Sequence, residues 1–146
     1  MTLRSSSLAL AAAFGSTATA SHANPSDVWA LLKQIEIDEI VTDTNYEVRK
    51  TYPTGIAEEQ MVEITGYAAP MMPGTTFREL VLVSDMGLCP FCGSVDHGAA
   101  LQVTLADPID TVDETRRITL RGTLKRVNDP ETWQAVILEN AQIVTQ

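Results

Sequence analysis

The sequence predicts a small, mainly β domain: an OB-like antiparallel barrel with a short N-terminal helix. From Met61 onward apolar residues recur at every second position, which is typical of strands with one buried face. About five such strands follow one another, without a helical stretch long enough for a crossover between them. Gly66 and Gly122 lie inside two of these strands, where we expect bulges or corners of the barrel. A small β-sandwich is the alternative architecture.

Residues 1–23 have the order of a cleavable secretory signal peptide. Arg4 and the amino terminus supply positive charge, an apolar run extends from Leu8 to Phe14, and small residues lead to Ala23. The apolar run is much shorter than the roughly 20 residues that span a bilayer. We therefore expect cleavage after Ala23, a periplasmic or secreted protein, and no stable membrane insertion. A disordered Ala/Ser-rich tail is the alternative.

Removal of this segment leaves 123 of the 146 residues, the size of one domain. One of the ten basic residues and none of the nineteen acidic ones is lost, so the formal charge changes from −9 to −10. Such an acidic domain lacks the basic surface that binds nucleic acid or anionic membranes. His97 is then the only histidine of the protein, and it lies close to the only two cysteines.

Residues 24–60 are expected to form an N-terminal helix and a connector. Apolar residues of "NPSDVWALLKQIEIDEIV" recur at helical spacing on one face, at Val28, Leu31, Leu32 and Ile35. This pattern predicts a short amphipathic helix, or a helix that runs into an extended segment near Ile37. The polar residues 42–60 are expected to connect it to the barrel, with one short strand around 46–48.

Residues 61–146 are expected to form the barrel. "MVEITGY" alternates, "ELVLVSD" has the continuous apolar character of a buried strand, and both "ALQVTLA" and "RRITLRGTLKRV" alternate again. After the turn "NDPE", the stretch "TWQAVILENAQIV" returns as a final strand or strand pair. The acidic residues between the third and fourth of these stretches are expected to form a solvated loop.

Four stretches of the sequence are similar to those of a known group of proteins: "MVEITGYAAPM", "FRELVLVSDMGLCPFCG", "ALQVTLADPI" and "ITLRGTLKRV". The chain resembles, over residues 28–144, a family of small exported bacterial proteins with an OB-like domain. In that family a Gly-Tyr-x-x-Pro strand end is followed by a cysteine-containing loop. Some members are associated with metal-related ABC transporters. The resemblance thus implies an ABC-type envelope transporter or a metal chaperone as partner.

The candidate site is the stretch "MGLCPFCGSVDHG", which contains a Cys-x-x-Cys-x4-His array. Cys89 and Cys92 can supply two thiolates from one tight turn, and His97 can supply a ring nitrogen. Together they would occupy three corners of a tetrahedral zinc site. Asp96, Asp85 or a water molecule could complete it.

Copper is the alternative metal, because Met71, Met72 and Met86 offer thioether ligands that suit Cu(I). Methionines of this kind also pack in protein cores. The residues thus favour a metal-binding protein, for zinc or copper, that acts in metal delivery or sensing or as accessory to an envelope transporter. No arrangement of residues typical of a hydrolase is present in the sequence.

Two other functions remain open for the same cysteines. An exported protein could cycle a Cys89–Cys92 disulfide, although thioredoxin-like chemistry needs a helix after the first cysteine, and Gly93 and Gly98 interrupt that stretch. The pair could also form a structural bridge in a protein-interaction module, since export implies an oxidising compartment. So small a loop would contribute only about 2 kcal/mol of stability.

Overall fold

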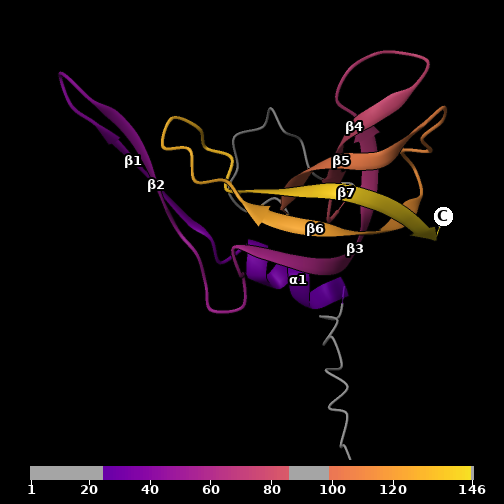
Figure 1. The fold of residues 1–146 in the computed structure, drawn as a ribbon, viewed down its shortest axis with the longest axis horizontal. Helices are drawn as coiled ribbons and strands as arrows, with labels where there is room; N and C mark the ends of the chain where they lie inside the picture. Colours follow the sequence, from indigo (N-terminus) through magenta and orange to yellow (C-terminus); the bar gives the residue numbers. More distant parts are fainter. Residues whose placement is uncertain (1–24, 86–98, 146) are drawn as a thin grey trace, which may run out of the picture.

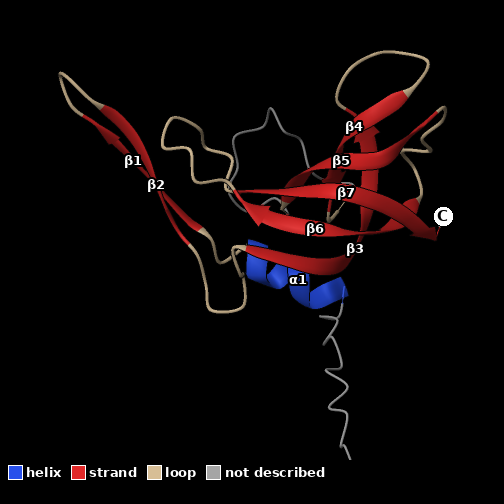
Figure 2. Cartoon of the chain, viewed as in Figure 1, coloured by secondary structure: helices blue, strands red, loops and turns tan. Residues whose placement is uncertain are grey.

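The structure is a computed structural model of the chain, and it describes residues 25–85 and 99–145. The described residues form one short helix, a two-stranded hairpin and a closed five-stranded barrel (Figures 1 and 2). The elements are α1 (Pro25–Leu32), β1 (Glu36–Val41), β2 (Tyr46–Thr51), β3 (Glu59–Pro70), β4 (Phe77–Val83), β5 (Ala100–Ile109), β6 (Arg117–Arg126) and β7 (Val136–Thr145). The prediction of a small, mainly β, OB-like barrel with a short N-terminal helix is confirmed.

The barrel has the strand order β3-β4-β5-β7-β6 and closes where β6 pairs with β3. Its neighbouring strands are antiparallel except β5 and β7, which run parallel. The long strand β3 pairs with β6 from Glu59 to Tyr67 and with β4 from Tyr67 to Pro70. One strand therefore forms two sides of the barrel. This is the topology of a Greek-key OB-type barrel.

The core of the barrel follows from the alternation in the sequence, because successive side chains of a strand point to opposite faces. Most inward side chains of the five strands are at most 1% exposed, at Val62, Ile64, Ala68, Leu80, Leu82, Leu101, Val103, Leu105, Leu120, Leu124, Leu138 and Ala141. Full burial of one such large aliphatic side chain contributes about 1.5–3 kcal/mol. Apolar burial on the inner face therefore accounts for the closed barrel.

The pairing of β6 with β7 contains a β-bulge at Gly122 of β6. The register between these strands shifts between Arg121 and Thr123, where β7 contains one extra residue. Asn140 adopts a positive φ of 50° there, a conformation that asparagine tolerates better than most residues. A Cβ atom on Gly122 would lie 2.9 Å from the carbonyl oxygen of Glu139. The expectation of a bulge at Gly122 is thus confirmed.

Gly66 lies where β3 changes partners, and helix α1 packs against this corner (Figure 1). A Cβ atom on Gly66 would lie only 2.5 Å from the carbonyl oxygen of Val83. Trp29 is buried beside it, and its indole Nε1–H donates to the carbonyl oxygen of Thr65 at 2.8 Å. The helix therefore closes the barrel where β3 bends away from β6.

The hairpin formed by β1 and β2 projects from the barrel and lies along the loop between β6 and β7, residues 127–135 (Figure 1). Polar contacts hold it there: Val48 N–H donates to Pro130 O (2.7 Å), Lys50 Nζ donates to Val127 O (2.9 Å) and Asp129 O (2.7 Å), and the Tyr52 hydroxyl donates to Ala135 O (2.8 Å). Burial lowers the pKa of Lys50, and nearby Asp129 opposes that change. The sequence indicated only an extended segment near Ile37 and a short strand near residue 46, without this pairing.

Candidate functional site

The predicted metal ligands Cys89, Cys92, Asp96 and His97 lie in residues 86–98, outside the described residues, as does Met86. The structure does describe where this segment leaves and rejoins the barrel. Val83 at the end of β4 pairs with Ala100 at the start of β5, and the backbone N–H of Ser84 donates to the carbonyl oxygen of Ala99 at 3.2 Å. The two ends of the segment are therefore held side by side by a β-ladder.

Ser84 and Ala99, where the segment leaves and rejoins the barrel, lie at the same end of the barrel as the loop 127–135. β5 begins there at Ala100 and its parallel neighbour β7 begins at Val136. The side chain of Gln134 in this loop donates from Nε2 to Oε1 of Gln102 on β5, at 2.8 Å. The loop 127–135, which contacts the hairpin, is thus hydrogen-bonded to β5, the strand that follows residues 86–98.

The other residues considered as ligands are exposed and lie apart. Asp85 directly follows the β4 side of the ladder. Met71 and Met72 follow β3 at the other end of β4, and they are 43% and 72% exposed. Within residues 25–85 and 99–145, no three histidine, cysteine or acidic side chains are grouped so that they could hold a metal ion.

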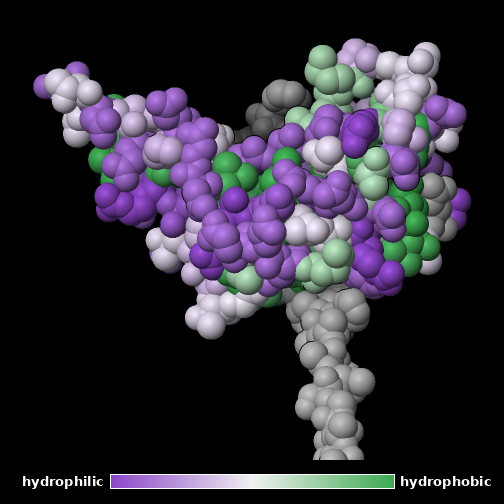
Figure 3. Space-filling view, viewed as in Figure 1, coloured by the Kyte–Doolittle hydropathy of each residue, from purple (hydrophilic) through white to green (hydrophobic). Residues whose placement is uncertain are grey.

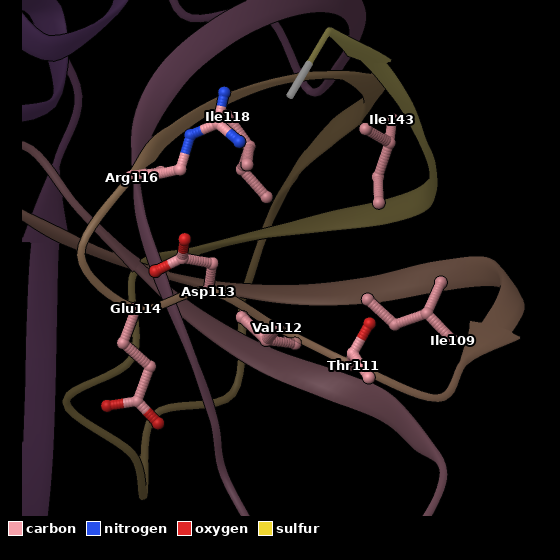
Figure 4. A pocket seen from close by; sticks show the side chains of 8 residues that line it. All are labelled: Ile109, Thr111, Val112, Asp113, Glu114, Arg116, Ile118 and Ile143. Carbon is pink, nitrogen blue, oxygen red and sulfur yellow. The ribbon is translucent and has the colours of Figure 1, made fainter.

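The opposite end of the barrel contains a pocket that the sequence did not predict. β5 and β7 pair only as far as Leu105 and Ala141, and beyond these residues a pocket of about 450 Å³ opens beside the loop that joins β5 to β6. Its apolar wall consists of partly or fully buried aliphatic side chains, at Ile109, Val112, Ile118 and Ile143 (Figure 4). The sequence showed these positions only as part of an acidic, solvated loop and its flanking strands.

The mouth of this pocket carries charges of both signs. Asp113 accepts hydrogen bonds from the side-chain hydroxyl of Thr115 at 2.6 Å and from its backbone N–H at 3.0 Å. These bonds, with a smaller contribution from Arg116, lower the pKa of Asp113, so its carboxylate stays ionised. Glu114 points away from the other lining side chains (Figure 4). Among the described residues, the lining has an apolar wall and acidic and basic side chains, but neither histidine nor cysteine for nucleophilic catalysis.

Comparison of the chain with protein-family models, with curated proteins and with solved structures found no match. In the part of the chain that the structure describes, none of the helical residues form a segment long and apolar enough to cross a membrane.

Proposed function

We propose that this protein is an exported carrier of a transition metal ion, zinc first and copper second, that binds the ion through Cys89, Cys92 and His97. Asp96 is the proposed fourth protein ligand. In this role the protein delivers metal to, or acts as accessory to, an ABC-type envelope transporter or a metal chaperone. The observation that carries the proposal is the combination of both cysteines and the only histidine after Ala23 in one short segment.

The chemistry of these donors supports zinc. Two thiolates and an imidazole are among the most frequent ligands of tetrahedral zinc sites. The same thiolates also bind Cu(I). Met71 and Met72 lie at the other end of β4 from the point where the segment leaves the barrel, so they are not part of this donor set. The acidic surface, with a formal charge of −9 for the full chain, raises the concentration of cations near the protein.

The β-ladder at the base of the segment also supports the proposal. Because the ladder already holds Ser84 next to Ala99, the entropy of closing this loop is lost on folding of the barrel, and metal binding has only to order the residues in between.

The test is to purify the protein from the periplasm without added metal or reductant, and to measure bound metal and free thiols on the same sample by native mass spectrometry. We expect close to one metal ion per chain and two free thiols. His97→Ala should weaken zinc binding at least about tenfold, and Cys89→Ser should abolish it. Asp107→Asn, an exposed acid on β5 outside the segment, is the matched control and should keep the metal.

A complete Cys89–Cys92 disulfide without metal would overturn the proposal. The reduction potential of that disulfide would then separate the two remaining functions. A potential near those of the periplasmic oxidants would indicate a thiol-disulfide protein, and a much lower one would indicate a structural bridge in an interaction module.

A further inference from the structure

The projecting hairpin exposes an aromatic pair. Trp133 of the loop 127–135 donates from its indole Nε1–H to the hydroxyl oxygen of Tyr46 at 2.9 Å, yet these side chains remain 50% and 40% exposed. Val41, the partner of Tyr46 across the hairpin, is 68% exposed. Glu39 lies on the same face of β1, two residues before Val41. We call Glu39, Val41, Tyr46 and Trp133 the hairpin surface.

Strand β1 also has a free edge within the described part of the chain. Its only described neighbour is β2, so every second backbone N–H and C=O group of Glu36–Val41 points away from a partner strand. Such an edge is a template on which another extended segment can pair. The hairpin surface and this edge adjoin each other, because both include Glu39 and Val41.

The charge of the edge strand is strongly negative. Glu36, Asp38 and Glu39 are all exposed on β1. The two cations of the hairpin neutralise them only in part, because Arg49 lies opposite Asp38 in the register, whereas neither cation lies opposite Glu36 or Glu39. Arg49 lies 3.7 Å from Glu47, and Lys50 donates to backbone carbonyl groups of the loop 127–135. Figure 3 shows hydrophilic residues gathered over the projecting hairpin, with hydrophobic ones among them.

We propose that the edge of β1 and the hairpin surface bind a basic, extended segment of a partner protein. The segment adds a strand beside β1 through backbone hydrogen bonds. On the face that carries Glu39 and Trp133, one of its lysine or arginine side chains pairs with Glu39 and another stacks on the indole of Trp133. Tryptophan and tyrosine are the residues that most often dominate the energy of such interfaces.

The negative charge of β1 also determines which kind of partner can bind to its edge. A second copy of the chain would bring the acidic side chains of β1 against the same side chains of its partner, and like charges on paired strands are destabilising. Nucleic acid and anionic membranes carry the same sign of charge as the hairpin, so they are repelled. A cationic protein segment is the occupant that both the unpaired edge and the acids favour.

The test uses an immobilised library of short peptides in which Val, Ile, Thr or Tyr alternates with Lys, Arg, Gln, Glu or Asp, probed with the labelled full chain. We expect selection of Lys and Arg over Glu and Asp. For a selected peptide, Trp133→Ala and Glu39→Lys should each weaken the affinity about tenfold. Glu114→Lys makes the same charge change at the other end of the barrel and should change the affinity less than about twofold.

A second measurement locates the bound peptide. In amide hydrogen exchange the selected peptide should protect backbone groups of residues 36–41, and the barrel strands should be unchanged. A library without preference for cations, or equal binding by the Trp133→Ala variant, would overturn the proposal. So would protection of residues 36–41 that increases with protein concentration in the absence of peptide, because the edge would then bind a second copy. None of these outcomes depends on metal at Cys89, Cys92 or His97, so the two proposals can fail separately.

Discussion

The barrel and the hairpin are both built from antiparallel ladders, but they are held together by different interactions. Every barrel strand buries alternate side chains completely, whereas the hairpin buries only Val48, and β1 buries none. The barrel is stabilised by apolar area removed from water. The hairpin is stabilised by hydrogen bonds to the loop 127–135, which contribute about 1 kcal/mol each. Strand pairing alone therefore does not indicate how firmly a segment of this protein is held.

The largest expected effect is on the core of the barrel. Leu120→Ala removes a side chain that is 0% exposed, so the free energy of unfolding should fall by about 3 kcal/mol. Denaturant titration followed by circular dichroism measures this change. Val41→Ala, an equally apolar truncation on the exposed hairpin, should change the free energy by less than about 0.5 kcal/mol. Similar losses in the two variants would contradict the contrast between barrel and hairpin.

The corner at Gly66 should be nearly as sensitive. Gly66→Ala places a methyl carbon only 2.5 Å from the carbonyl oxygen of Val83. Because backbone rather than a flexible side chain must move, we expect a loss of about 2 kcal/mol. Gly74→Ala is the matched control, since its Cβ atom would have no neighbour nearer than 3.6 Å. Equal midpoints in thermal unfolding for the two variants would show that the corner is not tightly packed.

An intermediate effect is expected where the hairpin meets the barrel. Tyr52→Phe removes the hydroxyl that donates to Ala135 O, at a cost of about 1 kcal/mol near neutral pH. Burial raises the pKa of Tyr52 above its ordinary value of 10.0, while Arg126 lowers it. The stabilising effect of the neutral phenol is therefore complete below pH 10 and is lost as the pH rises through the raised pKa.

The pH dependence of the difference between wild type and Tyr52→Phe isolates this residue. Lys50, whose pKa is lowered, and Lys125, whose pKa is raised by Glu139 and Glu59, are present in both proteins and cancel in the difference. The difference in unfolding free energy, measured with urea between neutral and alkaline pH, should decrease above pH 10. A difference that stays constant would mean that the Tyr52 hydroxyl ionises equally in the folded and unfolded chains.

The smallest effect should follow loss of the exposed hydrogen bond between Trp133 and Tyr46. Trp133→Phe removes the indole donor from a pair that water already reaches, so global stability should change by less than about 0.5 kcal/mol. Amide exchange at Val48, whose N–H donates to Pro130 O, reports on docking of the hairpin and should become only slightly faster. Much faster exchange at Val48 would show that the aromatic pair, rather than the backbone contact, holds the hairpin in place.

The barrel strands were predictable because each carries its own pattern. Val62 and Ile64, like Leu101 and Val103, alternate with polar residues, and this local signal matches the buried face of each strand. The hairpin was not predictable in the same way. "EIDEIV" has no regular alternation, and the groups that hold β2 in place belong to a loop about 80 residues further along the chain.

The metal-ligand segment and the pocket at the other end of the barrel also differ in how far the sequence predicts them. The donor set Cys89, Cys92 and His97 is visible in the sequence, and its binding of metal stays a prediction because the segment lies outside the described residues. The pocket at the other end was not visible. It depends on where β5 and β7 stop pairing, beyond Ala141, and neither strand carries a local pattern that marks this point.

The parallel contact between β5 and β7 has a consequence for the order in which the protein can fold during synthesis. β7 is the last of the barrel strands to leave the ribosome, yet it lies between β5 and β6. Until the chain has emerged beyond Thr145, β5 and β6 each lack a neighbour and the ring cannot close. For the export proposed above, such a delay would be an advantage, because an open set of strands is easier to pull apart for passage through a translocation channel than a completed barrel.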